Sequence, residues 1–482
     1  MVTKIRKLIQ STDNLMELIR NGNPMMRSEK MRLAAWLSLP SMLAQLSTII
    51  MEYIDAAMVG SLGAHASAAI GLVSTTIWLF GGLCSSCSTG FYVQVAHCIG
   101  AKDFSGARTV LRQSIVAVLI VGVSIMLIGM AICKQLPIWL GGGDDICHDA
   151  SLYFLIVSTS LPIVQINSLA GGMLRSSGNM HVPSMLNVLM CFLDVVFNLL
   201  LIFPTHSISL CGAELTIPGA NLGVMGAALG TLIAIAISAS LMLWFLLCKS
   251  KILNLRNSTG RYWPQKNIVL KALKISLPMG VEHTIFCCAQ IVTTIIVAPL
   301  GTAAIAANAF GVIVESLCYM PGYGIGESAT TLVGQSLGAG REALARSFAR
   351  ITVGMGVGIM TLMGIVMYVS APWVMQLMTP DILVQRLTID ALRIEAFAEP
   401  MFAASIVAYG VFVGAGDTLM PCIMNLFSIW SVRIVLSALL VAPMGLQGVW
   451  LAMCIELCFR GVIFLVRLSR NSWSKGKKEI LK

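Results

Sequence analysis

The stretch LSLPSMLAQLSTIIMEYIDAAMVGSLGAHASAAIG, residues 37–71, decides the fold, because a diverged copy follows as ISLPMGVEHTIFCCAQIVTTIIVAPLGTAAIAANA at residues 275–309. Pro40 matches Pro278, a distance of 238 residues. The same offset relates further pairs along both halves without a gap: Gly63 and Gly301, Gly100 and Gly338, Arg108 and Arg346, Pro162 and Pro400, Gly178 and Gly416. Two similar halves predict a pseudo-two-fold axis with a functional site between them, as in many membrane transporters.

The composition places this chain in a lipid bilayer. Of its 482 residues, 57% are apolar and 11% are charged, whereas soluble proteins average about 25% charged residues. A hydrocarbon core needs ~20 apolar residues per helix. The sequence therefore predicts an all-α integral membrane protein of twelve transmembrane helices in two six-helix lobes, at residues 33–59, 67–96, 110–133, 151–174, 183–204, 223–248, 272–298, 305–334, 348–370, 390–412, 420–442 and 447–466.

The distribution of Lys and Arg predicts the orientation. Seven of these residues and no acid lie between Lys249 and Lys274, and six lie in the tail after residue 466. By the positive-inside rule both regions are cytoplasmic. We expect a basic N-terminal segment (1–32), a first lobe (33–248), a linker (249–271), a second lobe (272–466) and a basic tail (467–482), with both termini on the cytoplasmic side of the cytoplasmic (inner) membrane. The net charge of +10 reflects this bias, so we expect no nucleic-acid partner.

The N-terminal segment has an amphipathic pattern. Its apolar residues Ile5, Leu8, Ile9, Leu15, Met16 and Ile19 fit one face of a short helix on the inner leaflet. A partly ordered tail fits the same residues equally well. No apolar core of a cleavable signal peptide follows the first basic cluster.

Sequence motifs exclude several kinds of chemistry. The sequence has no GxxxxGK[ST] or HExxH motif, and its 14 cysteines are scattered mainly through apolar spans. We expect no cofactor, and energy for transport would come from an ion gradient. Turn residues, with Gly178/Pro183 repeated as Gly416/Pro421, are structural. His97, which aligns with Gln335, reads as a helix cap.

Acidic residues inside apolar spans are the candidate functional groups. An ionisable side chain at membrane depth costs ~2.5 to 3.5 kcal/mol on insertion scales and usually faces a partner or a cavity. The sequence contains nine of these: Glu52, Asp55, Asp194, Glu282, Glu315, Glu327, Glu395, Glu399 and Glu456.

A first cluster of polar residues is predicted in the first lobe. Asp194 and Asn198 are four residues apart on one helix face, and Asp55 and Thr231 lie at a matching depth in other spans. Two carboxylates, an amide and a hydroxyl suit Na+ or a shared proton. A hydrogen-bonded polar knot that ties the three spans together is the alternative.

Several motifs resemble those of multidrug and toxic compound extrusion (MATE) transporters. They are MEYIDAAMVGSLGAHASAAIG (51–71), APLGTAAIAANAFG (298–311), TTLVGQSLGAGR (330–341), RSSGNMHVP (175–183) and VGAGDTLMP (413–421), and the similarity extends over about residues 33–467. The resemblance implies two six-helix lobes in a V and export of organic cations in exchange for H+ or Na+. It also implies that Asp55 is the coupling aspartate and that Ala227 and Thr231 supply a carbonyl and a hydroxyl to the ion. One departure is the order Asp194 then Asn198, where many members have Asn then Asp.

In the second lobe, Glu282 and Glu399 each lie about one turn from the acidic positions of some family members, near Phe286 and Phe402. We interpret them, with Glu52 and Glu315, as carboxylates of a substrate cavity. Arg433 and Glu456 have similar depths and are predicted to form a structural ion pair. Arg460 is predicted to reach toward the cytoplasmic interface.

The sequence thus favours a monomeric antiporter that exports small organic, cationic amphiphilic compounds and contacts only these and membrane lipids. The alternatives are a lipid-linked-oligosaccharide flippase of the same superfamily, which twelve spans and an acidic cavity disfavour, and a membrane-embedded enzyme. An enzyme such as an acyltransferase needs a His/Asp constellation, and only His283, beside Glu282, is deeply placed. A channel is disfavoured because no ring of filter residues occurs. The substrate and the choice between H+ and Na+ are left open.

Overall fold

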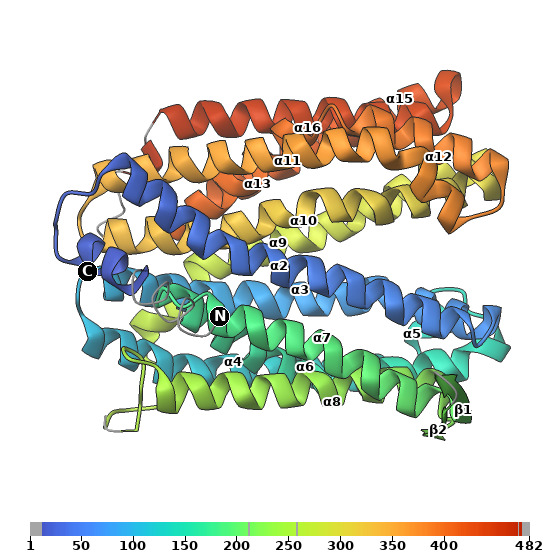
Figure 1. The fold of residues 1–482 in the computed structure, drawn as a ribbon, viewed down its shortest axis with the longest axis horizontal. Helices are drawn as coiled ribbons and strands as arrows, with labels where there is room; N and C mark the ends of the chain where they lie inside the picture. The colour runs from blue at the N-terminus through green and yellow to red at the C-terminus, as the bar shows by residue number, and fades with distance from the viewer. Residues whose placement is uncertain (1–11, 211–212, 257–258, 471, 475–482) are drawn as a thin grey trace.

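The computed structural model describes residues 12–210, 213–256, 259–470 and 472–474. Eleven of its helices are long and apolar enough to cross a membrane, or twelve when one bent pair counts as a single span. The long helices run roughly parallel to one another along the long axis (Figure 1). The prediction of an all-α multi-pass membrane protein is therefore confirmed.

The first lobe contains six long helices and one short one. They are α2 (Arg27–Gly60), α3 (Ala64–Gly100), α4 (Phe104–Ile132), α5 (Leu136–Trp139), α6 (Asp144–Ser176), α7 (His181–Ile202) and α8 (Gly223–Trp244), which continues into a π-helical turn, η1 (Phe245–Lys249). Helix α3 packs against α4 and α6, and α7 packs against α8. An antiparallel hairpin, β1 (Pro204–Leu210) and β2 (Ala213–Ala220), separates α7 from α8. The apolar runs of the sequence predict no element at this hairpin.

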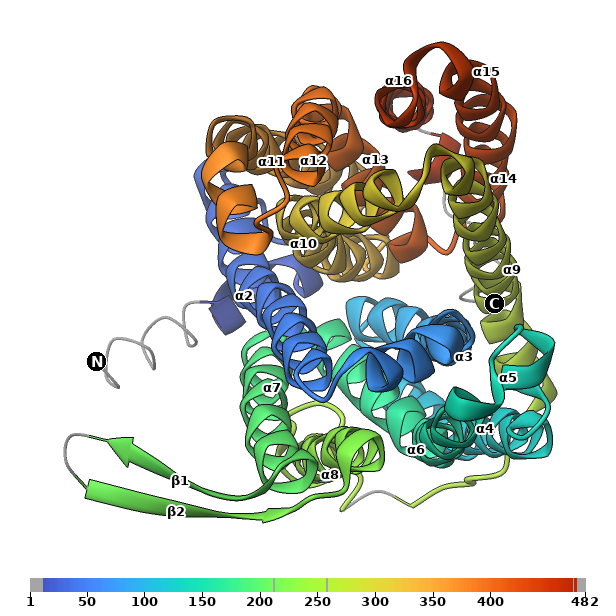
Figure 2. The same ribbon diagram turned by 90° about the vertical axis from the view of Figure 1, so that its right-hand side faces the viewer.

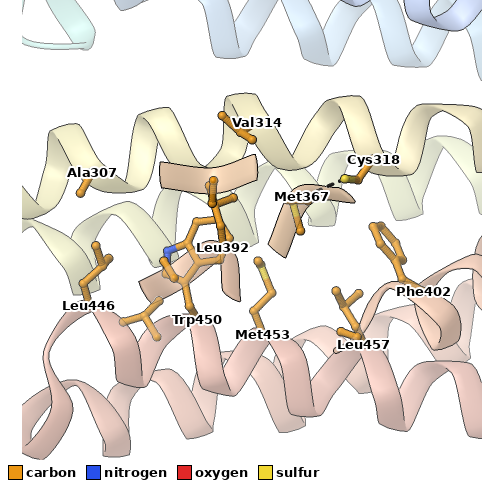
Figure 3. Close-up of a cluster of buried hydrophobic side chains, with 14 of the residues drawn as sticks. Ala307, Val314, Cys318, Met367, Leu392, Phe402, Leu446, Trp450, Met453 and Leu457 are labelled. Carbon is orange, nitrogen blue, oxygen red and sulfur yellow. Dashed lines mark hydrogen bonds between the residues drawn. The ribbon is translucent and has the colours of Figure 1, made fainter. Parts of the chain in front are cut away.

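The second lobe repeats this order with more interruptions. It contains α9 (Lys266–Val297), η2 (Ala298–Leu300), α10 (Thr302–Gly338), α11 (Glu342–Met378), α12 (Ile382–Glu395), α13 (Glu399–Gly414), α14 (Leu419–Phe427), η3 (Ser428–Ile434), α15 (Val435–Met444), α16 (Leu446–Ser469) and η4 (Ser472–Ser474). Its apolar core includes Trp450, Met453 and Leu457 of α16 together with Phe402 of α13 and Cys318 of α10. Trp450 lies beside Leu392 of α12, and Leu457 lies near Phe402 (Figure 3).

Two predicted spans of the second lobe are not simple helices. The expected span 390–412 is broken between α12 and α13, which meet at an angle of 61°. Pro400 opens α13 in its first turn, where its missing N–H leaves no hydrogen bond unmade. The expected span 420–442 is α14, η3 and α15 in succession, because a π-helical segment interrupts the α-helix at residues 428–434.

The helices extend beyond the apolar runs from which they were predicted. Helix α2 begins at Arg27 rather than at residue 33, α9 begins at Lys266 rather than 272, and α16 ends at Ser469 rather than 466. The charged and polar residues at these ends belong to the same helices. They were not included in the predicted spans because those spans were defined by runs of apolar residues. The linker between the lobes accordingly shortens to residues 250–265.

The two ends of the molecule differ. We call the end at which α3 and α10 finish, near Gly100 and Gly338, the basic end, because it carries the linker and the loop with Lys102. The opposite end is the hairpin end, where α5, α12 and the two strands lie (Figure 1). Seen from the hairpin end, the two lobes lie one above the other and meet at α2 and α3 of the first lobe and α10 of the second (Figure 2).

The described part of the N-terminal segment packs against the lobes. Residues 12–20 are helical, and Met16 and Ile19 are buried against residues of α10 and α11 at the basic end. The expectation that these two side chains face the inner leaflet is therefore wrong, because the lobes offer them an apolar surface. Ile5, Leu8 and Ile9 lie outside the described residues.

Candidate functional site

The predicted polar cluster of the first lobe is assembled around Asn198. The Asn198 Nδ2 atom donates to Oδ1 of Asp55 at 2.9 Å and to Oδ2 of Asp194 at 3.1 Å. Asp55 comes from α2, whereas Asp194 and Asn198 are one turn apart on α7. Asp194 and Asn198 are each 1% exposed. The i, i+4 spacing and the matching depths thus bring together the residues that the sequence predicted.

Two oxygens of this cluster have no hydrogen-bond partner within the protein. They are Oδ1 of Asp194 and Oδ1 of Asn198. Leaving a buried polar atom without a hydrogen-bond partner costs free energy. In native structures a buried polar atom that no protein group bonds is therefore usually bonded to a water or an ion. These two oxygens are therefore free to accept a proton donor or a cation.

Helix α8 completes the cluster. A Cβ added at Gly230 would overlap the Asn198 carboxamide, so glycine is required for this close approach of α8 to α7. The next residue, Thr231, donates its hydroxyl to the Ala227 carbonyl at 3.2 Å and lies beside the Asp194 carboxylate. The structure therefore collects all five residues predicted from sequence.

The cluster favours binding of a small cation. Two carboxylates next to the same amide nitrogen repel each other strongly where water is excluded, unless a proton or a cation lies between them. The available donor atoms are oxygens, which suit a hard cation. Among the described residues no group of three His, Cys, Asp or Glu converges.

Glu282 occupies a different environment in the second lobe. It lies on α9 and accepts hydrogen bonds from the Tyr409 hydroxyl at 2.8 Å and from Asn425 Nδ2 at 2.5 Å. These two partners are not acids and were not predicted from the sequence. The repeat carried a signal for one of them, because Asn425 matches Asn187, which donates to the Ala44 carbonyl at 3.4 Å.

The other predicted cavity carboxylates are divided between surface and core. Glu52 is exposed, Glu315 is 6% exposed, and Glu399 is fully buried, as is Glu395 four residues before it. All four carboxylate oxygens of Glu395 and Glu399 lack hydrogen-bond partners. The prediction that Glu315 and Glu399 line a cavity is therefore wrong for this conformation. The bend between α12 and α13 directs Glu399 toward α11, where it packs against Gly364.

The predicted Arg433–Glu456 pair is also corrected. Glu456 accepts two hydrogen bonds from Arg460, at 2.7 Å from Nε and 2.6 Å from Nη2, and a third from the Ser428 hydroxyl. Arg433 instead directs Nη2 at the sulfur of Met453, at 2.6 Å. The closer partner of Glu456 is Arg460, one turn away on the same helix. The prediction rested on similar depths in two different spans and did not consider this i, i+4 spacing. Arg460 is therefore a buried partner in an ion pair.

Side-chain contacts also join the two lobes. Glu327 of α10 lies 3.6 Å from Nη2 of Arg175 on α6 and accepts from Gln45 of α2 at 3.4 Å. His283 of α9 contacts the Trp78 carbonyl at 3.1 Å, and the two rings are 5.2 Å apart. His283 therefore takes part in an interlobe contact and not in a His/Asp pair.

Comparisons with known proteins agree with this architecture. The sequence model of the MatE family matches residues 40–200 and 278–439. A "Probable multidrug resistance protein NorM" of Thermotoga maritima is 24% identical, over 94% of this chain and 94% of its own. A "Multidrug resistance protein PmpM" of Pseudomonas aeruginosa is 22% identical, over 90% of each. A solved structure of an outward-facing multidrug resistance MATE family transporter of the MOP superfamily shares the fold, with a TM-score of 0.85 and 21% identity, over 95% of this chain and 98% of that one.

Proposed function

The chain belongs to the MatE family, and on this premise we propose that it is an antiporter that exports small organic cations in exchange for H+ or Na+. The single observation that carries the coupling is the buried Asp55–Asn198–Asp194 cluster with its two unbonded oxygens. The similarity to multidrug resistance proteins supports efflux of several compounds rather than one.

The ion would bind where the first lobe supplies oxygen atoms. Oδ1 of Asp194 and Oδ1 of Asn198 are unpaired, the Asp55 carboxylate is adjacent, and Thr231 and Ala227 add a hydroxyl and a carbonyl. Occupation of this set by a proton or by Na+ offsets the repulsion between the two carboxylates. Release of the ion restores that repulsion, so the two occupancy states favour different arrangements of α2 and α7.

The substrate would meet carboxylates rather than ammonium or guanidinium groups. Glu282 is half-buried on α9, and Glu52 is exposed on α2, one turn before the cluster. A cation is attracted to such groups, and more strongly where water is excluded. This charge pattern supports organic cations as the substrate class, and an acidic cavity disfavours the flippase alternative.

The orientation in the membrane forms part of the proposal. The basic end carries the linker and would face the cytoplasm, with the hairpin end on the opposite side of the cytoplasmic membrane. One chain carries both lobes, so a monomer contains the complete pathway. Alternating access would then open each end in turn.

The proposal is tested by efflux of a fluorescent cation from proteoliposomes or everted vesicles, with a pH gradient or a Na+ gradient imposed separately. We expect uphill movement of the dye under at least one gradient. Movement under neither gradient contradicts the antiport proposal, and movement under only one identifies the coupling ion.

A further inference from the structure

The two lobes close on each other at the basic end through contacts that follow the internal repeat. His97 of α3 lies 2.8 Å from the Gly414 carbonyl of the second lobe, and Gln335 of α10 donates to the Ser176 carbonyl of the first lobe at 2.7 Å. His97 and Gln335 are 238 residues apart, as are Ser176 and Gly414. These side chains, expected to be helix caps, therefore connect the lobes.

The backbones are also in direct contact at this closure. A Cβ added at Gly100 would overlap the Gln335 backbone, and one at Gly338 would overlap the His97 backbone. Opening of the basic end must therefore separate α3 from α10.

A segment near the N-terminus lies across this closure. We call residues 12–25 the strap. Its helical residues 12–20 bury Met16 and Ile19, which are 2% and 0% exposed, and Met25 follows at 9%. These side chains pack with Leu332 and Phe348 of the second lobe. Met16 also contacts Gly178 in the turn between α6 and α7 of the first lobe.

Arg20 of the strap binds both lobes at once. Its Nε donates to Oε1 of Gln335 at 3.2 Å, and its Nη2 donates to the Ser177 carbonyl at 3.0 Å. The same Gln335 carboxamide makes the closing bond to Ser176. The guanidinium thus connects to the closure through Gln335, and separation of the lobes breaks at least one of its hydrogen bonds.

Arg341 fixes the strap to the second lobe. Its Nη1 donates to the carbonyls of Leu18 and Ile19 at 2.9 and 3.3 Å, and its Nη2 donates to the Asn23 carbonyl at 2.8 Å. A cation at this place satisfies carbonyls at the end of a helix and interacts favourably with its dipole. The matching position of the first half is Asp103, which instead caps its own helix α4. The two halves therefore differ at this position, because Arg341 binds the strap whereas Asp103 binds its own helix.

We propose that the strap is a latch that holds the basic end closed, with Arg20 and Arg341 as its gating residues. The inference rests on the proposed alternating access. A contact made in only one of two conformations shifts the equilibrium toward that conformation. The strap thus lowers the fraction of transporters that are open at the basic end and sets how readily that end opens.

The test uses hydrogen–deuterium exchange of the full chain in lipid nanodiscs, without gradient or transported compound. Arg341→Gln and Arg20→Gln are compared with the unmodified protein. Arg346→Gln is the matched control, because Arg346 lies on the same helix but bonds Glu342 and Ser474 within the second lobe. We expect exchange at the basic-end turns of α6 and α10 to become at least about tenfold faster in the two strap variants, as for loss of a charge-assisted hydrogen bond. The control should be unchanged.

Two results overturn the proposal. Faster exchange confined to residues 12–25 means that the strap detaches without opening the lobes. In that case the strap does not hold the basic end closed. Unchanged exchange in both strap variants means that the contacts do not hold the closure. Because neither result depends on transport, failure of the latch is distinguishable from failure of the antiport proposal.

Discussion

Glu282 and Glu399 show how much the surroundings of a carboxylate decide its role. Both lie in apolar spans of the second lobe, and the sequence placed both in a cavity. Glu282 is half-buried with Tyr409 and Asn425 as donors, whereas Glu399 is enclosed by its own lobe without a donor. Sequence identifies an acid at membrane depth, but which way it points depends on a helix bend that hydropathy does not report.

This contrast gives a prediction at the scale of one residue. Glu282→Gln keeps the shape of the side chain and leaves Tyr409 and Asn425 within hydrogen-bonding distance. It removes the negative charge that attracts a cation. We expect weaker binding of tetraphenylphosphonium, by about tenfold for a partly desolvated charge contact, measured on purified protein by calorimetry. Glu399→Gln, the matched buried carboxylate, should leave that affinity unchanged. If both variants bind tetraphenylphosphonium as tightly as the unmodified protein, Glu282 has a structural role instead.

At the scale of the element, α16 carries an ion pair that stabilises the second lobe. Glu456 is fully buried and Arg460 is 8% exposed, and the two are one turn apart. The Ser428 hydroxyl at the start of the π-helical segment η3 also donates to Glu456. The pair therefore joins α16 to the place where the preceding span loses regular α-helical geometry.

Breaking this pair should destabilise the protein strongly. Glu456→Gln leaves Arg460 as an uncompensated buried charge, and we expect a loss of about 3 to 5 kcal/mol. The measurement is the thermal midpoint and the folded yield in detergent. The control is Glu342→Gln, which breaks an i, i+4 pair with Arg346 that is partly exposed and should cost about 0.5 kcal/mol or less.

The charge-removing double variant Glu456→Gln/Arg460→Met separates this account from a direct role in transport. We expect it to recover part of the lost stability, because the buried Arg460 cation is then no longer left without Glu456. A single variant that folds normally but does not transport would contradict the structural role.

Other features of the elements were hidden from the sequence. Residues 390–412 read as one apolar span, yet the chain bends between Glu395 and Glu399. Pro400 fits the first turn of a new helix and also a kink within a longer one, so composition alone does not choose between them. The cluster on α7 was predictable, by contrast, because Asp194 and Asn198 share a helix face at any orientation of that helix.

At the scale of the whole molecule, the repeat predicted the two lobes, and the family match divides the chain at the same places, from residue 40 and from residue 278. The repeat also relates His97 to Gln335 in sequence. It did not show that each side chain reaches into the opposite lobe, because that contact depends on how the lobes are placed. In the repeat the strap matches the start of the linker, and its binding site combines Gln335 of the second lobe with Ser177 of the first.

The central claim is that the Asp55 cluster couples an ion to the movement of the lobes. An asparagine at position 55 has nearly the shape of aspartate and still accepts from Asn198 through its carbonyl oxygen. It has no negative charge to hold Na+ and does not take up or release a proton. Folding and drug binding should therefore survive the substitution while coupling does not.

The measurement that tests this claim most directly is uphill efflux of a fluorescent cation by Asp55→Asn in proteoliposomes, under a pH gradient and a Na+ gradient in turn. Asp144→Asn, an exposed acid at the start of α6, is the control and should transport like the unmodified protein. We predict that Asp55→Asn binds the dye normally and shows no gradient-driven efflux. Efflux by Asp55→Asn at the unmodified rate under both gradients would contradict the account and leave the cluster as a polar knot between α2, α7 and α8.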